Sequence, residues 1–432
     1  MYFAYSHEPI SCYFAHSARD FVVQEIPLYA FSGSGEHRIL KVRKKSLSTF
    51  ELLSIIAKAF NLPPKSIGYA GLKDKHATTT QYLSLPAKSS QNFHAIFERL
   101  AKEYEIKLLD STLHSNKLRL GHLKGNRFFV RTKKLNPTNA TKLESTFAHI
   151  AHNGFPNFFG FQRFGIKGDN YLLGLSLSQR KNAQISPYLS LLTQLHPSLA
   201  NPQNPLFYTK RYSRAMQEFF ISSYQSFLFN GWLQARIQLS AWAREFSPKE
   251  LQQLAQHYGK LESQDPLKST TNLESTFETP LQSAQNACIA TLCARFLQSL
   301  PKVALESLCA QPQAFTLLEG DLCCHYPYGK LFTLDSATQA ECERFSQQGF
   351  SPTGALSGQN LKAPSTLAGQ LEQSFISPIP APSSRRYAWV WASEVEFCYK
   401  PEVAQAELHF SLPSGAYATS FLEQVLKQFL RS

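Results

Sequence analysis

The sequence of 432 residues lacks several patterns that mark whole classes of protein. No window approaches the roughly 20 consecutive apolar residues of a membrane-spanning helix. The N-terminus has no basic stretch followed by an apolar run, so a secretory signal peptide is not expected. We therefore expect a soluble protein of the cytoplasm without a membrane partner.

Cysteine is present, but not in the spacing of a metal or disulfide framework. The eight cysteines form no C-x-x-C pair and no paired cysteine and histidine spacing of a zinc site. We expect reduced thiols, most of them in the core, and no metal. Glycine-rich loops that cradle nucleotides are missing too, so we expect no cofactor.

The chain has ample material for packed cores, because 43% of its residues are hydrophobic. Its length exceeds the size at which a single core usually stops growing, so we expect two or three domains.

Charge is unevenly distributed along the chain. The net charge is +13, and residues 1–180 hold 25 Lys and Arg against 12 Asp and Glu, whereas residues 181–432 hold 19 against 19. A basic half of this kind favours a polyanion as partner. An anionic membrane is the competing explanation, but we find no basic amphipathic helix with an aromatic face.

Residue patterns predict alternating strands and helices in the first part of the chain. Ser48 and Glu51 form a capping-box pattern that opens a helix, and Asn61 with the following prolines ends it. Alternating or β-branched runs predict strands at residues 20–26, 37–45, 66–69, 78–85 and 117–120. Apolar residues at helical spacing predict helices at residues 93–104, 218–239 and 284–297, and one from about residue 420.

The segment between two of these strands carries a carboxylate among cations. Residues 71–81 read GLKDKHATTTQ, which places Asp74 between Lys73 and Lys75 with His76 next to them. Flanking cations keep a carboxylate ionised, and an ionised aspartate can act as a nucleophile on carbon. The alternative is a solvated charge run in a loop.

This segment resembles the signature of the TruD family of tRNA pseudouridine synthases. Four more blocks resemble the same family in the same order, namely DFVVQE at 20–25, KLRLGHLKGN at 117–126, PNFFGFQRFG at 156–165 and LPSGAYATS at 412–420. Between residues 165 and 412 only YQSFLFN at 224–230 and SPTG at 351–354 are similar to the family.

The resemblance implies an α+β fold. Its core would be a pseudouridine-synthase-like mixed, largely antiparallel sheet with helices, interrupted by an inserted, mainly helical or mixed domain. We therefore expect a first part of the catalytic core at residues 1–184, the inserted domain at 185–380 and the C-terminal part of the core at 381–432.

The resemblance also implies the reaction, which is isomerisation of a uridine in tRNA to pseudouridine. Uridine 13 is the expected target, with tRNA-Glu as a candidate. Asp74 takes the place of the nucleophile; Phe21, Asn157 and Tyr417 match substrate-contacting positions, and Phe159 matches an aromatic residue expected against the base. The reaction needs no cofactor, and we expect a monomer.

Basic residues near these motifs are candidates for contacts with the RNA backbone. They share a place in or beside the family-like blocks, and they are Lys73, Lys75, His76, Lys117, Arg119, Lys124 and Arg127. The alternation at residues 117–120 predicts that Lys117 and Arg119 lie on one strand face and the leucines on the other. Clustering favours phosphate contact over a solvated face. One departure is Ala15, beside His16, where family members often carry a basic residue.

Two other functions would account for part of the sequence. A non-catalytic RNA-binding protein would explain the basic first part, but it gives no reason for an acid within a basic segment. A metal-dependent nuclease would need several carboxylates around a cation, and the segment at Asp74 supplies one.

Overall fold

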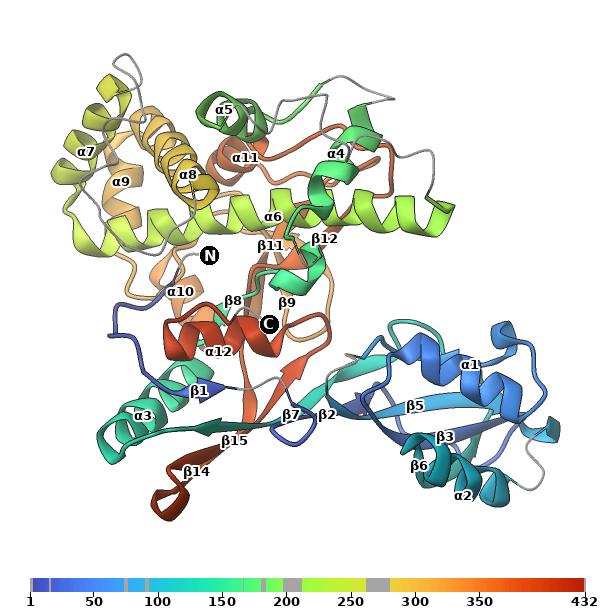
Figure 1. Ribbon diagram of the computed structural model, residues 1–432. Coiled ribbons are helices and arrows are strands. Elements are labelled where there is room, and N and C mark those ends of the chain that lie inside the picture. Colours follow the sequence, from blue (N-terminus) through green and yellow to red (C-terminus); the bar gives the residue numbers. More distant parts are fainter. Residues whose placement is uncertain are drawn as a thin grey trace.

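The computed structural model describes residues 3–14, 17–73, 77–89, 93–165, 167–179, 184–196, 212–261 and 280–430. The predicted nucleophile Asp74, with Lys75 and His76, lies outside the described residues, and so do Ala15 and His16. Within the described part, the fold combines a large mixed sheet with a helical region (Figure 1), as expected for the α+β class.

The largest sheet has nine strands. Its main path runs β14-β15-β7-β2-β5-β3-β6, with β1 paired to β7 and β4 paired to β5. Only the β2 and β5 pair is parallel, and the other pairs are antiparallel. The strands are β1 (Tyr13–Phe14), β2 (Phe21–Pro27), β3 (His37–Lys45), β4 (Gly68–Tyr69), β5 (Thr78–Pro86), β6 (Lys107–His114), β7 (Leu123–Lys133), β14 (Ser393–Lys400) and β15 (Gln405–Pro413).

Two helices cover the β3, β5 and β6 end of this sheet, in the lobe at the right of Figure 1. Helix α1 (Thr49–Ala59) opens with the predicted capping box, since Ser48 Oγ accepts from the Glu51 amide and the Glu51 carboxylate accepts from the Ser48 amide. Helix α2 is Phe93–Tyr104. Short 3-10 helices at Pro64–Ser66 and Ala87–Ser89 complete the lobe.

The opposite end of the sheet packs on α3 and α12. Helix α3 (Pro137–Asn153) and helix α12 (Ala418–Leu426) share an apolar core with β7 and β15. Strand β15 pairs with β7 along its whole length, from Gln405 opposite Lys133 to Pro413 opposite Gly125. The C-terminal segment therefore forms part of the same sheet as the N-terminal motifs.

The helical region is built around α6 (Arg214–Glu245), the long helix that crosses the upper part of Figure 1. Other helices pack around it, and they are α4 (Asn170–Gln179), α5 (Pro187–Leu195), α7 (Pro248–Leu261), α8 (Pro280–Ser299), α9 (Lys302–Cys309), α10 (Gln339–Ser346) and α11 (Thr366–Gln373). A four-stranded sheet lies beneath, in the order β10 (Leu331–Thr333), β9 (Leu322–His325), β11 (Phe350–Leu356) and β12 (Ser384–Tyr387).

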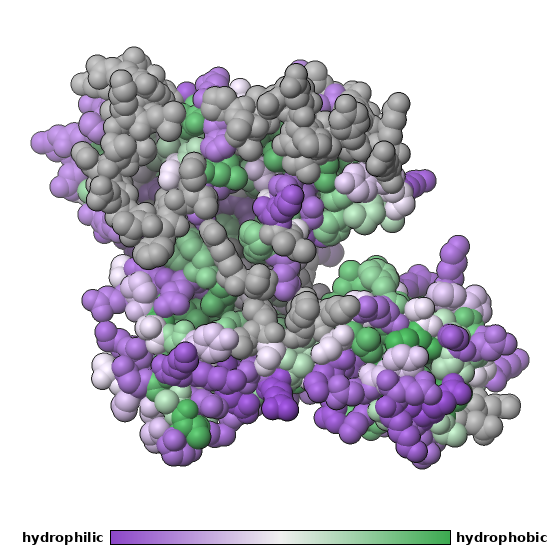
Figure 2. Space-filling model, in the orientation of Figure 1, coloured by the Kyte–Doolittle hydropathy of each residue, from purple (hydrophilic) through white to green (hydrophobic). Residues whose placement is uncertain are grey.

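A small sheet links the two regions. Strand β8 (Phe155–Pro156) pairs with β13 (Trp389–Val390), and the 3-10 helix η3 (Phe161–Phe164) follows β8. The last 3-10 helix, Pro401–Val403, joins β14 to β15. Figure 2 shows that the molecule is hollowed between the helical region above and the α1 and α2 lobe at the lower right.

One predicted strand is wrong. Residues 117–120 form no strand, and the chain turns there, with the amide of His122 donating to the Arg119 carbonyl. The two leucines do not share a face, because Leu118 is buried at 2% exposure and Leu120 is 64% exposed. Four residues of alternation are too few to specify a strand when the chain must reverse direction before β7.

The cysteines are free thiols in this structure. Four are buried, three are partly buried and Cys398 is exposed. Within the described ranges, no three His, Cys, Asp or Glu side chains gather as a metal would require. No helix among the described residues combines the length and apolar character needed to cross a membrane.

Candidate active site

A cavity of about 280 Å³ lies where the family-like motifs meet. Its wall comes from β2, β7, residues 70–73, Gln162 and residues 414–419. These segments are far apart in sequence, and the pairing of β7 with both β2 and β15 brings them together. Lys73 belongs to this wall, and Asp74 is the next residue in the chain.

Two of the predicted substrate-binding aromatics line this cavity. Phe21 lies at the start of β2, is 3% exposed and packs against Phe128 with ring centroids 6.0 Å apart. Tyr417 lies at the N-terminal end of α12 and is partly exposed. The cavity therefore has one aromatic ring that is anchored in the sheet core and one that is more accessible.

The cavity wall that the described residues form does not include Phe159. Its ring is 8% exposed, and the Arg386 guanidinium lies 4.0 Å from the ring centroid. Edge-to-face contacts with Phe229 and Tyr417 cover other parts of the ring. Phe159 also lines a neighbouring cavity of about 540 Å³, together with Phe158 and Phe161, and its expected contact with the target base stays a prediction.

Asn157 is likewise committed to the protein. Its side chain is buried at 3% exposure, its Nδ2 donates to the Tyr387 carbonyl at 3.0 Å, and its Oδ1 accepts from Arg386 at 2.7 Å. The cavity wall formed by the described residues does not include it. The Asn157 amide holds Arg386 in place, and its expected contact with uracil stays a prediction.

Lys73 forms a buried ion pair with Glu25. Its Nζ lies 2.8 Å from Glu25 Oε1, and the two side chains are 5% and 0% exposed. The Lys73 amide also donates to Thr49 Oγ1 at 2.8 Å, and the Tyr82 amide donates to Glu25 Oε2 at 2.7 Å. Burial raises the pKa of Glu25, although Lys73, the Tyr82 amide and Lys44 each act to lower it.

This pairing occupies the Lys73 ammonium group, which is almost fully buried beside a carboxylate. The contact with the RNA backbone that we expected for Lys73 stays a prediction. The sequence pattern identified a cationic residue beside Asp74 but could not show that its partner lies 48 positions earlier, on β2.

The remaining basic candidates differ in how accessible they are. Arg119 and Lys124 are exposed, whereas Lys117 donates from Nζ to the Lys65 carbonyl. Arg127 is exposed but is paired with Glu394 at 2.6 Å. Of these four residues, Arg119 and Lys124 are therefore the best placed to contact a phosphate.

Sequence reasoning missed Asn126 in the wall and one cation near it, whereas Gln162 was considered as a residue that supports the loop or contacts RNA. Asn126 and Gln162 line the cavity, and Asn126 Oδ1 makes no hydrogen bond to the described residues. Both residues belong to family-like blocks, which was the available signal. Arg386 lies in none of those blocks, and only the pairing of β12 with β11 and its bonds to Asn157 place it here.

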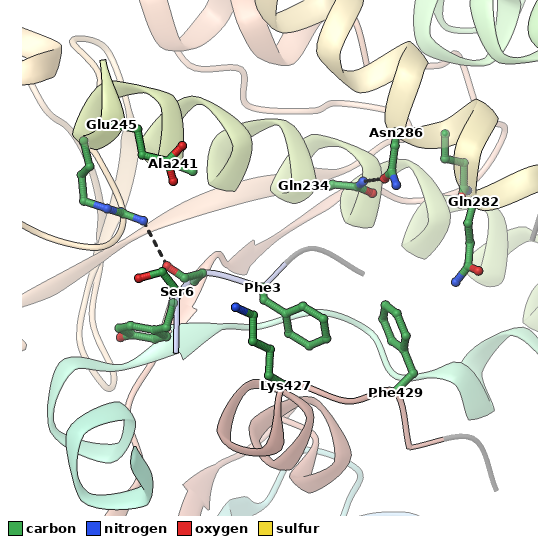
Figure 3. Close-up of a pocket in the computed structure, with 13 residues that line it drawn as sticks. Phe3, Ser6, Gln234, Ala241, Glu245, Gln282, Asn286, Lys427 and Phe429 are labelled. Carbon is green, nitrogen blue, oxygen red and sulfur yellow. Dashed lines mark hydrogen bonds between the residues drawn. The ribbon is translucent and has the colours of Figure 1, made fainter. Parts of the chain in front are cut away.

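A second cavity, shown in Figure 3, lies away from these motifs. It is bounded by the N-terminal segment around Phe3, helices α6 and α8, and the chain end around Phe429. Gln234 and Asn286 are hydrogen bonded at 2.7 Å across its upper side. It contains none of the predicted site residues.

Comparisons with known proteins agree with the motif pattern. The model of the family described as "tRNA pseudouridine synthase D (TruD)" matches residues 1–188. A Helicobacter hepaticus protein named tRNA pseudouridine synthase D is 43% identical over 425 residues, which are 98% of this chain and 95% of the relative. A Wolinella succinogenes protein of the same name is 38% identical, over 97% of this chain and 96% of the relative.

The fold also matches that of a solved structure. A crystal structure of a candidate tRNA pseudouridine synthase D from Methanosarcina mazei aligns with a TM-score of 0.55 and 19% sequence identity, over 99% of this chain and 96% of the other. At that identity the match supports the fold, while the near full-length relatives carry the family assignment. The chain therefore belongs to the TruD family of tRNA pseudouridine synthases.

Proposed function

We propose that this chain converts a uridine of a tRNA to pseudouridine in the cavity between β2, β7 and residues 414–419, with Asp74 as the nucleophile. The observation that carries the proposal is the meeting of five separate family-like blocks around one cavity. Uridine 13 remains the proposed target. A cytoplasmic location, a monomeric state and the division at residues 184 and 380 are further parts of the proposal.

The reaction is an isomerisation. The bond between C1′ of the ribose and N1 of uracil breaks, the base turns, and a new bond forms between C1′ and C5 of the base. The proton on C5 leaves and N1 gains one, so no external group is consumed. This chemistry calls for one ionised carboxylate at the reacting carbon and a pocket that holds the base.

The substrate base must leave its stack to reach the cavity. Unstacking costs about a few kcal/mol, and stacking on an aromatic ring contributes about 1–3 kcal/mol per base. Tyr417 is the accessible aromatic of the wall, so we assign the stacking contact to it, with Phe21 closing the opposite side. The side chain of Asn126 is a candidate partner for the uracil edge, because a primary amide both donates and accepts.

The ion pair of Lys73 and Glu25 has a supporting role in this proposal. It fixes the chain one residue before Asp74, both through the side chain of Lys73 and through its amide bond to Thr49. A nucleophile must lie close to the reacting carbon, and small misplacements reduce the rate strongly.

The decisive experiment replaces Asp74 with asparagine. We expect Asp74→Asn to abolish pseudouridine formation while leaving tRNA affinity nearly intact, because the amide keeps the shape and loses the nucleophile. Pseudouridine would be mapped in tRNA from cells with and without the protein and in single-turnover reactions. Asp335→Asn, an exposed position outside the cavity, is the matched control. Substantial turnover by Asp74→Asn would refute the assignment.

Two further arms separate the alternatives. Full activity in excess chelator would exclude the metal-dependent nuclease. A protein that binds tRNA but produces no pseudouridine in any tested RNA would favour the non-catalytic RNA-binding function.

A further inference from the structure

Two arginines lie close to the buried Phe159 ring. The guanidinium of Arg386, from β12, is 4.0 Å from the ring centroid, and that of Arg163, from η3, is 5.8 Å from it. Arg386 donates from Nε to the Asn157 carbonyl at 3.1 Å and from Nη2 to Asn157 Oδ1 at 2.7 Å. Its orientation is therefore fixed by the FPNFFG segment.

Neither arginine has a carboxylate partner among the described residues. Arg163 donates to the hydroxyl groups of Ser222 and Ser226, and Arg386 donates to the backbone and amide oxygens of Asn157. By contrast, Arg385 on the same strand pairs with Glu372 at 2.7 Å. Among the described residues, the lack of a carboxylate partner thus distinguishes Arg163 and Arg386 from Arg385.

The electrostatic consequences are visible in both side chains. Burial lowers the pKa of Arg386 to about 10, and the nearby charge of Arg163 also acts to lower it. Burial lowers the pKa of Arg163 as well. Removing a cation from water without a compensating anion is unfavourable, so such a pair favours the arrival of an anion.

The arginines adjoin the wall of the candidate active site. Nη1 of Arg386 would lie 3.4 Å from a Cβ atom at Gly415, and Gly415 itself lines the cavity. Gly415 has a φ of +86°, a conformation that favours glycine, and any side chain there would touch the guanidinium. Gln162, directly before Arg163, also lines the cavity.

We infer that Arg386, with Arg163 beside it, binds a backbone phosphate of the RNA next to the target uridine. The inference rests on the proposed function, because the RNA supplies the anion. Arginine suits this role, since its planar group presents several N–H donors to phosphate oxygens. Asn157 then holds the arginine in position through two hydrogen bonds.

The test measures equilibrium binding of a tRNA substrate to the full chain carrying Asp74→Asn. We expect Arg386→Gln to weaken binding about tenfold or more, as for the loss of one charge-assisted contact. We also expect the slope of log K against log salt to fall by about 0.7 to 0.9 units, the amount for one phosphate. Arg214→Gln, at a 93% exposed arginine at the start of α6, is the matched control and should change neither quantity.

A second arm identifies the phosphate. Single methylphosphonate linkages, which lack the charge, would be placed in turn on either side of the target uridine. One of these linkages should weaken tRNA binding to the protein that retains Arg386. The same linkage should not weaken tRNA binding to Arg386→Gln any further. Arg386→Lys should retain that dependence, because it keeps the charge.

The outcomes are distinguishable from those of the proposed function. Binding is measured without turnover, so activity of Asp74→Asn would refute the nucleophile and leave the arginine result standing. If Arg386→Gln does not fold, Arg163→Gln is measured in its place, because among the described residues the Arg163 side chain donates to two serine hydroxyls. An unchanged salt slope, or a loss of affinity that no single linkage reproduces, would overturn the inference.

Discussion

The side chains of Lys73 and Glu25 form an ion pair of 2.8 Å that is almost completely buried, one residue before Asp74. A buried pair of this kind contributes little net stability, because desolvation offsets much of the attraction. Its value here is geometric. It holds Lys73 against Glu25 on β2, so the segment that precedes Asp74 is held in place at the cavity wall.

We predict that Lys73→Met lowers the free energy of unfolding by about 3–5 kcal/mol, since it leaves the Glu25 charge buried without its partner. Denaturant unfolding of the variant gives this value. Adding Glu25→Gln should recover much of the stability, because no buried charge remains. If the pair positions the loop, the double variant should stay slow in single-turnover reactions. Recovery of both stability and rate would show the pair to be structural only.

A second prediction separates the two aromatic residues. Tyr417→Ala should reduce turnover strongly with a small change in melting temperature, because the ring lines the cavity and is partly exposed. Phe159→Ala should instead cost about 3–5 kcal/mol of stability, as for other buried phenylalanines. Thermal unfolding beside single-turnover kinetics measures both. If the Phe159→Ala protein melts at the wild-type temperature but turns over slowly, the result would support a stacking contact between Phe159 and the base.

A third prediction concerns the exposed basic residues. Arg119→Gln and Lys124→Gln should each weaken binding to all RNAs alike and flatten the salt dependence by roughly one unit per lost phosphate contact. Fluorescence titrations over a range of salt concentrations give the slopes. Lys142→Gln is the control and should leave the slope unchanged, because Lys142 is an exposed lysine of α3 that pairs with Glu8. If the slopes of all three variants equal that of the wild type, Arg119 and Lys124 are solvated and do not contact phosphate.

A fourth prediction follows from Glu423 on α12. The side chain is 6% exposed, its Oε1 accepts from the Leu430 amide, and burial raises its pKa from 4.5 to about 7. The folded state therefore holds a proton that the unfolded state releases between these values. The resulting stability is present below about pH 4.5 and is lost as the pH rises through about 7.

The test compares Glu423→Gln with wild type across this range. Relative to wild type, the variant should gain about 3 kcal/mol of stability between pH 4.5 and pH 8, because its amide does not ionise. Denaturant unfolding at several pH values gives the difference. Glu402→Gln, at an exposed position, should show no such trend. A constant difference between Glu423→Gln and wild type would contradict the raised pKa.

The sequence by itself determined the local elements and the family. The capping box of α1 and the alternation in β3 depend on neighbours within a few residues, so both can be predicted from the sequence alone. The motif blocks identified the family and marked Phe21 and Tyr417, both of which line the cavity. The same local reasoning failed at residues 117–120, where a chain reversal overrides a short alternation.

Only the tertiary structure decided which partners the motif residues contact. Lys73, Asn157 and Phe159 lie in motif blocks, yet each is buried against a partner that is remote in sequence, namely Glu25 for Lys73 and Arg386 for the other two. A motif indicates that a residue type is needed at a position. It does not indicate whether that residue contacts the substrate or another residue of the protein. That distinction depends on burial and on long-range pairing of β7, β12 and β15, which no local pattern encodes.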